Sequence, residues 1–262
     1  MTYTAKRQNM PEKGRGRSGS RASGRPRGGI LAGIAGGLLI AACVYEGGID
    51  TPVTRKFTWF SYVSGDDIRA ACQPGSPEKY RIVYNARYDE QLRSYEILGD
   101  DIDQGGFVTA RAQGRASITN LSSDDLLAPW RWKKAQGRLD EQEMARLREA
   151  LAQAGFYGQP EVGLELNSKA FYWAAVGCVD GKFYFGGWQD PSTAFKALRF
   201  PEILFARDGT GLAVNPPRPL NPIELGRTSG PWQDRGGDIP RFLITVGEDG
   251  LQGGGLGFRS PL

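Results

Sequence analysis

Histidine is absent from this chain of 262 residues. Its absence excludes serine and cysteine nucleophiles that are activated by a histidine base. It also excludes zinc, haem and copper sites that use histidine ligands. A lysine or carboxylate base is compatible with the composition, but the side chain that most often titrates near neutral pH is missing.

Acidic residues are nearly absent from residues 1–27, which hold eight basic side chains and one acidic side chain, a net charge of +7. The remaining chain has 25 basic and 28 acidic side chains, a net charge of −3. Residues 1–27 lack apolar periodicity and are rich in Gly, Ser, Arg and Pro, so we predict a disordered cytoplasmic tail. A nucleic-acid-binding domain with a basic face is disfavoured, because the basic residues belong to the tail.

Charged side chains are also absent from residues 28–45, GGILAGIAGGLLIAACVY. A spanning helix needs about 17–25 residues, so we predict a transmembrane anchor or signal segment over residues 28–46. Basic residues precede this run and none follows it closely. The positive-inside rule then predicts a single pass through the inner membrane, with the N-terminus in the cytoplasm and the C-terminal domain in the periplasm.

Two features of this run leave its fate open. Residues 40–43, Ile-Ala-Ala-Cys, resemble a bacterial lipobox, and the resemblance implies lipidation at Cys43. Gly29, Gly33 and Gly37 are four residues apart and share one helix face, where small residues let two membrane helices approach and self-associate. We favour a retained anchor over a lipoprotein, and both over a free secreted protein.

Strand signals dominate the rest of the chain. Residues 80–88 alternate at period two, and the extended pattern continues through residues 91–97. An acidic glycine-rich turn and a partner strand from residue 107 follow, which predicts a long hairpin or meander. Asp180-Gly181, between aromatic arms, predicts a second hairpin with a two-residue turn.

One helix is well marked by its ends. Asp140 is the predicted N-cap, Glu143 completes a capping box, and Gly155 stands at the C-terminal end. The apolar stripe consists of Met144, Leu147 and Leu151. We therefore predict an α+β fold, mainly antiparallel β-sheet with one well-capped helix packed on it, preceded by a single transmembrane or signal helix.

Composition divides the chain into four regions. We expect a disordered basic tail (1–27), an anchor or signal segment (28–46), a periplasmic α+β domain (47–205) and a Pro/Gly-rich extension with one late strand (206–262). The start of the periplasmic domain reads as a linker that enters a strand or an amphipathic segment. The final Gly-rich residues read as a flexible tail.

Two cysteines lie beyond the predicted anchor, in the compartment predicted to be oxidising. An exported domain with two cysteines usually pairs them, so we predict a disulfide between Cys72 and Cys178. The acidic turn at residues 100–106 lacks a calcium ligand set, because Ala112 stands where the last glutamate is needed.

No catalytic, cofactor or metal site is predicted. The carboxylate pairs Asp66–Asp67 and Asp124–Asp125 are adjacent in sequence, and adjacent side chains point apart on a strand. Trp130 and Trp132 read as core or lid residues rather than a ligand platform.

These patterns favour a non-enzymatic, membrane-anchored accessory, assembly or interaction protein of the cell envelope. Its expected partners are the membrane and another envelope or membrane protein, with self-association through the anchor and no nucleic acid. The alternatives are an envelope lipoprotein with a structural or ligand-binding role, and a cell-envelope hydrolase that works through carboxylates.

Overall fold

The computed structural model describes residues 49–115, 130–222, 224 and 242–255. The predicted tail, the predicted anchor at residues 28–46, Cys43 and the glycines Gly29, Gly33 and Gly37 lie outside these residues, so their predictions stay predictions. Within the described ranges, no helix is long and apolar enough to cross a membrane.

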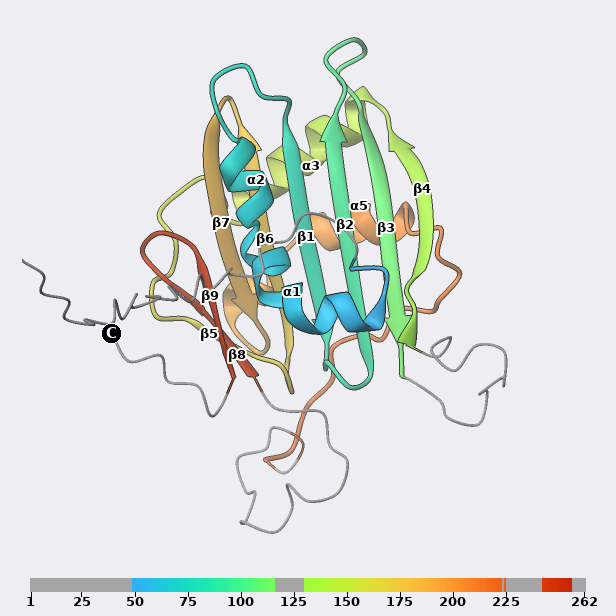
Figure 1. Cartoon of the computed structure of the whole chain (residues 1–262), viewed down its shortest axis with the longest axis vertical. Coiled ribbons are helices and arrows are strands. Elements are labelled where there is room, and N and C mark those ends of the chain that lie inside the picture. Colours follow the sequence, from blue (N-terminus) through green and yellow to red (C-terminus); the bar gives the residue numbers. More distant parts are fainter. Residues whose placement is uncertain (1–48, 116–129, 223, 225–241, 256–262) are drawn as a thin grey trace, which may run out of the picture. The chain divides into compact units, whose positions relative to one another are not determined.

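The centre of the fold is a six-stranded sheet in the order β4-β3-β2-β1-β6-β7 (Figure 1). Its strands are β1 (Lys79–Ala86), β2 (Gln91–Gly99), β3 (Gly106–Gly114), β4 (Lys133–Leu139), β6 (Phe171–Val179) and β7 (Lys182–Gln189). A second sheet, in the order β5-β8-β9, contains β5 (Glu165–Asn167), β8 (Phe242–Val246) and β9 (Leu251–Gly255). Every pairing in both sheets is antiparallel, so the prediction of a mainly antiparallel α+β fold is confirmed.

Helices cover both faces of the large sheet. The described residues form five helices: α1 (Pro52–Ser64), α2 (Asp66–Ala71), α3 (Glu141–Gln153), α4 (Thr193–Lys196) and α5 (Phe200–Ala206). In Figure 1, α1, α2 and the small sheet lie in front of the large sheet, and α3 and α5 lie behind it. The expectation of one helix was therefore wrong in number.

Because helices cover both faces of the large sheet, the side chains that alternate between the two faces of a central strand are buried on both sides. Tyr84 of β1 stacks on Trp173 of β6 behind the sheet, with ring centroids 4.6 Å apart. Val83, the next residue along β1, belongs to the core in front of the sheet, together with Trp59 of α1. The neighbouring interior strands β1 and β6 are consequently buried along almost their whole length.

The predicted capping box of α3 is confirmed. The Glu143 backbone N–H donates to the Asp140 carboxylate (2.8 Å), and the Asp140 N–H donates to the Glu143 carboxylate (3.2 Å). Gly155 follows the helix with a left-handed φ of 79°, as its position predicted. The stripe of Met144, Leu147 and Leu151 is buried against the rear face of the sheet.

The first described segment is a helix, α1, where the sequence indicated a linker leading into a strand or an amphipathic segment. Thr51 caps it by accepting a hydrogen bond from the Thr54 N–H (3.3 Å), and Pro52 occupies its first turn. Gly65, with a φ of 70°, ends it.

The long extended segment is two strands, not one. Arg87 adopts a left-handed φ of 57°, and its carbonyl accepts a hydrogen bond from the Glu90 N–H (2.8 Å). The chain reverses there between β1 and β2. Arginine is rarely left-handed, so the sequence carried no turn signal at this position.

Part of the Gly-rich ending is a strand, β9, rather than a flexible tail. A Cβ atom at Gly253 would overlap the ring of Phe60, which projects from α1. Phe60 also packs edge-on against Phe242 of β8, with ring centroids 5.4 Å apart. Glycine is therefore needed here because an aromatic side chain occupies the space above the strand.

We expect Gly253→Ala to lower the free energy of unfolding by about 1–3 kcal/mol, because overpacking forces Phe60 out of its place. Urea denaturation measures this loss, and adding Phe60→Leu to the variant is expected to recover part of it. Gly137→Ala is the matched control, because the nearest atom to its Cβ would be 4.0 Å away. Equal losses at both glycines would contradict the packing argument.

The cysteines Cys72 and Cys178 lie at disulfide distance, with Cα atoms 5.6 Å apart and a sequence separation of 106. Cys72 follows α2, and Cys178 lies in β6, so the link joins the front helices to the centre of the sheet. The neighbouring turn packs closely as well, because a Cβ at Gly181 would overlap the backbone of Pro74.

Because the loop closed by this link is long, the chain-entropy model gives about 4–5 kcal/mol of stabilisation. We expect the double variant Cys72→Ser, Cys178→Ser to lose about that amount in urea denaturation. Reduction of the unmodified chain should reproduce the loss, and reduction of the double variant should change nothing. A reductant-insensitive unmodified chain would contradict the link.

A fully buried arginine connects the front helices to the sheet. Arg81 donates to both carboxylate oxygens of Asp67 in α2 (each 2.7 Å) and to Glu96 in β2 (2.8 and 3.1 Å). Its guanidinium lies 4.0 Å from the ring centroid of Tyr62, whose carbonyl it also reaches. Arg111 of β3 completes the cluster by pairing with Glu96.

This cluster predicts sensitivity to acid. Burial acts to raise the pKa of Glu96, but Arg81 and Arg111 more than offset it, so the pKa lies below its ordinary value. A group whose folded pKa is depressed stabilises the fold fully above its unfolded pKa of about 4.3 and loses that effect as the pH falls through the folded pKa.

We therefore expect the free energy of unfolding to fall below about pH 4, and Glu96→Gln to flatten that fall while costing about 3–5 kcal/mol at neutral pH by leaving Arg81 short of a partner. Urea denaturation across a pH series measures both effects. Glu202→Gln, at an exposed carboxylate of α5, is the control, and its free energy of unfolding should fall below about pH 4 as in the unmodified chain. An equally steep fall of the free energy of unfolding in Glu96→Gln would refute the assignment of the acid sensitivity to Glu96.

Candidate functional site

A pocket of about 540 Å³ opens where the end of β7 meets a proline-rich segment. We call residues 215–222 of that segment the strap. The pocket is lined by Asn167, Ala170, Gln189, Asp190, Pro191, Lys196, Pro217, Arg218, Pro219 and Leu220. These residues come from four separate parts of the chain, and the strap supplies the wall that faces β7 and α4.

The strap is held by side chains of β1 and β2. The Tyr84 hydroxyl donates to the Asn215 carbonyl (2.8 Å), and the Asn215 N–H donates to the Gln91 side chain (2.9 Å). The Asn215 amide donates further to Ala86 and Glu90 (3.2 and 2.9 Å). The strap is thereby positioned by the end of the large sheet.

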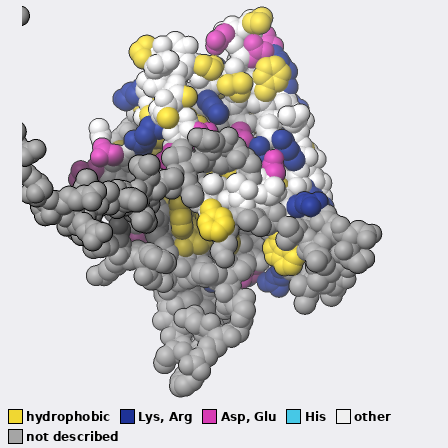
Figure 2. Space-filling view, viewed as in Figure 1, with side chains coloured by type: hydrophobic (Ala, Val, Ile, Leu, Met, Phe, Trp, Pro, Cys, Tyr) yellow, Lys and Arg dark blue, Asp and Glu magenta, His cyan; other side chains and the backbone are white. Residues whose placement is uncertain are grey.

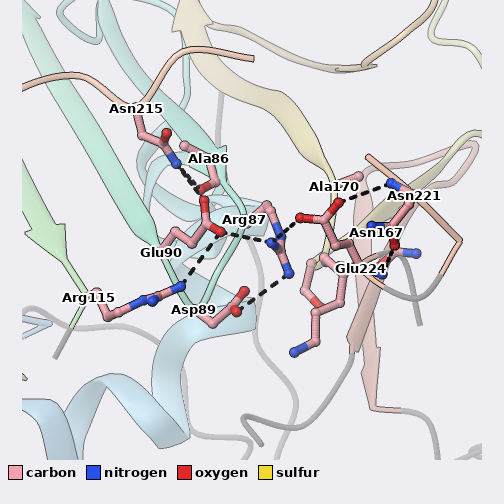
Figure 3. A network of polar contacts seen from close by, with 12 residues as sticks. Ala86, Arg87, Asp89, Glu90, Arg115, Asn167, Ala170, Asn215, Asn221 and Glu224 are labelled. Atoms are coloured by element: carbon pink, nitrogen blue, oxygen red, sulfur yellow. Dashed lines mark hydrogen bonds and ion pairs between the residues drawn. The ribbon is translucent and has the colours of Figure 1, made fainter. Parts of the chain in front are cut away.

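A closed ring of alternating charges fixes the far part of the strap, and Figure 3 shows Arg87 of this ring between Glu90 and Glu224. Arg87 donates to Glu90 (2.8 Å) and to Glu224 (3.2 Å). Arg218 donates to the same two carboxylates (3.0 and 2.9 Å). A backbone hydrogen bond from Asn221 and the Arg218 guanidinium hold the pKa of Glu224 below its ordinary value. Each guanidinium is therefore neutralised by the two glutamates.

The polar groups at the base of the pocket come from β5 and β7. The Gln189 side-chain oxygen accepts from the Asn167 N–H (2.6 Å), and the Asn167 side-chain oxygen accepts from the Lys169 N–H (2.9 Å). Burial raises the pKa of Asp190, and the positive charge of Lys196 opposes that effect. The pocket thus combines proline and leucine walls with one carboxylate, one ammonium, the Arg218 guanidinium and two amides.

A second feature is an exposed apolar patch, which we define as Leu98, Ile102 and Phe107. Leu98 of β2 and Phe107 of β3 are directly paired, and 42% and 51% of their surfaces are exposed. Ile102, in the turn between the two strands, is 95% exposed. Figure 2 shows hydrophobic side chains gathered at the upper end of the front face, beside acidic and basic ones.

Charged residues frame this patch. The Arg138 guanidinium lies 4.5 Å from the centroid of the Phe107 ring and donates to Asp100 (2.7 Å) and Asp103. Asp100 and Asp103 belong to the acidic turn that resembled a partial calcium loop, and the structure pairs both with arginine instead. Within the described ranges, no group of three or more metal-ligating side chains occurs.

The other residues singled out from the sequence have structural contacts. Asp67 binds Arg81, and Asp66 accepts a hydrogen bond from Ser64 (2.7 Å). Trp132 is buried beneath the guanidinium of Arg55, 5.1 Å from its ring centroid. The pair Asp124–Asp125 lies outside the described residues.

Sequence reasoning missed the pocket. The proline-rich stretch at residues 216–219 was visible only as composition, and nothing local linked it to Asp190 or Lys196. Comparison of the chain with protein-family models, with curated proteins and with solved structures found no match.

Proposed function

We propose that this chain is a non-enzymatic, membrane-anchored protein of the bacterial cell envelope that binds another envelope or membrane protein. Residues 28–46 would form the anchor, with the N-terminus in the cytoplasm and the described domain in the periplasm. The observation that carries the binding role is the patch of Leu98, Ile102 and Phe107, because clustered exposed apolar side chains with a polar rim mark interaction sites.

The position of the patch supports this role. Helices α1 and α2 and the small sheet cover the rest of the front face, and the patch occupies the end that they leave open (Figure 1). The cysteine pair supports the compartment, since disulfides persist in oxidising spaces. The change from a net charge of +7 to −3 across the predicted anchor supports the orientation.

Lipidation at Cys43 would keep the same domain in the envelope, and the lipobox-like residues 40–43 keep that alternative open. A carboxylate hydrolase would need two acids about 5–9.5 Å apart in one cleft. Asp190 is the one acidic side chain among the described lining residues of the pocket, which favours binding over hydrolysis.

We expect Phe107→Ser and Leu98→Ser to reduce recovery of a specific partner about tenfold or more when the full chain is captured from detergent-solubilised membranes and bound proteins are quantified. Both side chains are about half exposed, and Phe107 also loses its contact with Arg138, so the free energy of unfolding should fall by no more than about 1–2 kcal/mol and the chain should stay folded.

Val162→Ser is the matched control, because Val162 is 54% exposed on the segment between α3 and β5. It should leave the recovered proteins unchanged. A set of bound proteins that is the same for all three variants and the unmodified chain would refute the patch as the binding surface.

A further inference from the structure

We propose that the pocket beneath the strap binds a small zwitterion of the amino-acid class, a free α-amino acid or a short peptide, with the ligand's ammonium on Asp190 and its carboxylate on Lys196. This inference concerns a surface separate from the patch and does not depend on the proposed partner. The volume of the pocket, about 540 Å³, lies within the range of about 300–1,000 Å³ that is usual for small-molecule sites.

The charges of the pocket point to a ligand that carries both signs. Three charged residues line it, and Arg218 is already neutralised by Glu90 and Glu224. Neither Asp190 nor Lys196 has an ion-pair partner within 4.0 Å among the described residues, and the two do not pair with each other at that distance. A single ligand with an ammonium and a carboxylate would satisfy both.

The remaining groups fit the same class of ligand. The Gln189 side-chain oxygen is used by the Asn167 N–H, and no described residue accepts from its NH₂ group, which can donate to a ligand carboxylate. Pro191, Pro217 and Leu220 supply an apolar wall for a hydrophobic side chain. The pocket therefore favours an apolar amino acid over a charged one.

The strap makes the site preformed. The Asn215 hydrogen bonds and the ring of Arg87, Glu90, Arg218 and Glu224 hold the wall through contacts within the chain. A preformed wall lowers the ordering cost of binding, so that a ligand with few polar contacts can still be held.

The direct test is calorimetric titration of the full chain in detergent with leucine, dileucine, N-acetyl-leucine and leucinamide. The last two compounds lack the ammonium and the carboxylate respectively. We expect leucine or dileucine to bind, and each capped compound to bind about tenfold more weakly or worse. Tighter binding of leucine identifies a free amino acid, and tighter binding of dileucine identifies a short peptide. Equal affinity for capped and uncapped compounds, or no binding up to about 10 mM, would overturn the proposal.

Single variants assign the two charges. Asp190→Asn should weaken binding of the preferred zwitterion about tenfold or more and leave the weak binding of N-acetyl-leucine unchanged. Lys196→Gln should do the same for the zwitterion and leave leucinamide unchanged. Lys134→Gln, on the opposite edge strand β4, is the matched control and should bind as the unmodified chain does. Variants at Asp190 and Lys196 that fold and retain full affinity would overturn the assignment.

Discussion

The buried guanidinium of Arg81 is the constraint on which the front half of the structure depends. A fully buried charge is costly unless it is paired and hydrogen-bonded, and Arg81 finds its partners on two elements, Asp67 of α2 and Glu96 of β2. The chain must therefore bring α2 onto the sheet at one place. Cys72 follows directly after α2, so the same docking brings it to Cys178.

A second buried arginine does the same on the rear face. Arg93 of β2 pairs with Asp208 and donates to the Leu212 carbonyl and the Gln91 side chain. Burial raises the pKa of Asp208, but hydrogen bonds from Thr210 and Tyr95 more than offset it, and the net pKa is lowered. This cluster draws residues 208–212 onto the sheet, and the strap follows immediately. The pocket thus depends on a charge that lies behind the sheet.

Predictions succeeded where the deciding signal was local. The capping box of Asp140 and Glu143 and the turn at Asp180-Gly181 depend on a few consecutive residues, and both are present. Predictions failed where distant contacts override local preference. Arg87 turns the chain while held by Glu90 and Glu224, and the glycine-rich β9 pairs with β8, with Phe60 of α1 filling the space above Gly253.

The sequence by itself determined the separation of a +7 segment from a −3 remainder, the ends of α3, the alternation of β1 and the absence of histidine chemistry. Only the tertiary structure decided which carboxylates neutralise Arg81 and Arg93, which end of the front face stays open, and that Asp190 and Lys196 share a pocket with the strap. The physical reason is the distance along the sequence over which each kind of interaction acts. Backbone preferences act over a few residues, whereas desolvation and pairing of charge join residues that are 14 positions apart in Arg81–Asp67 and 115 positions apart in Arg93–Asp208.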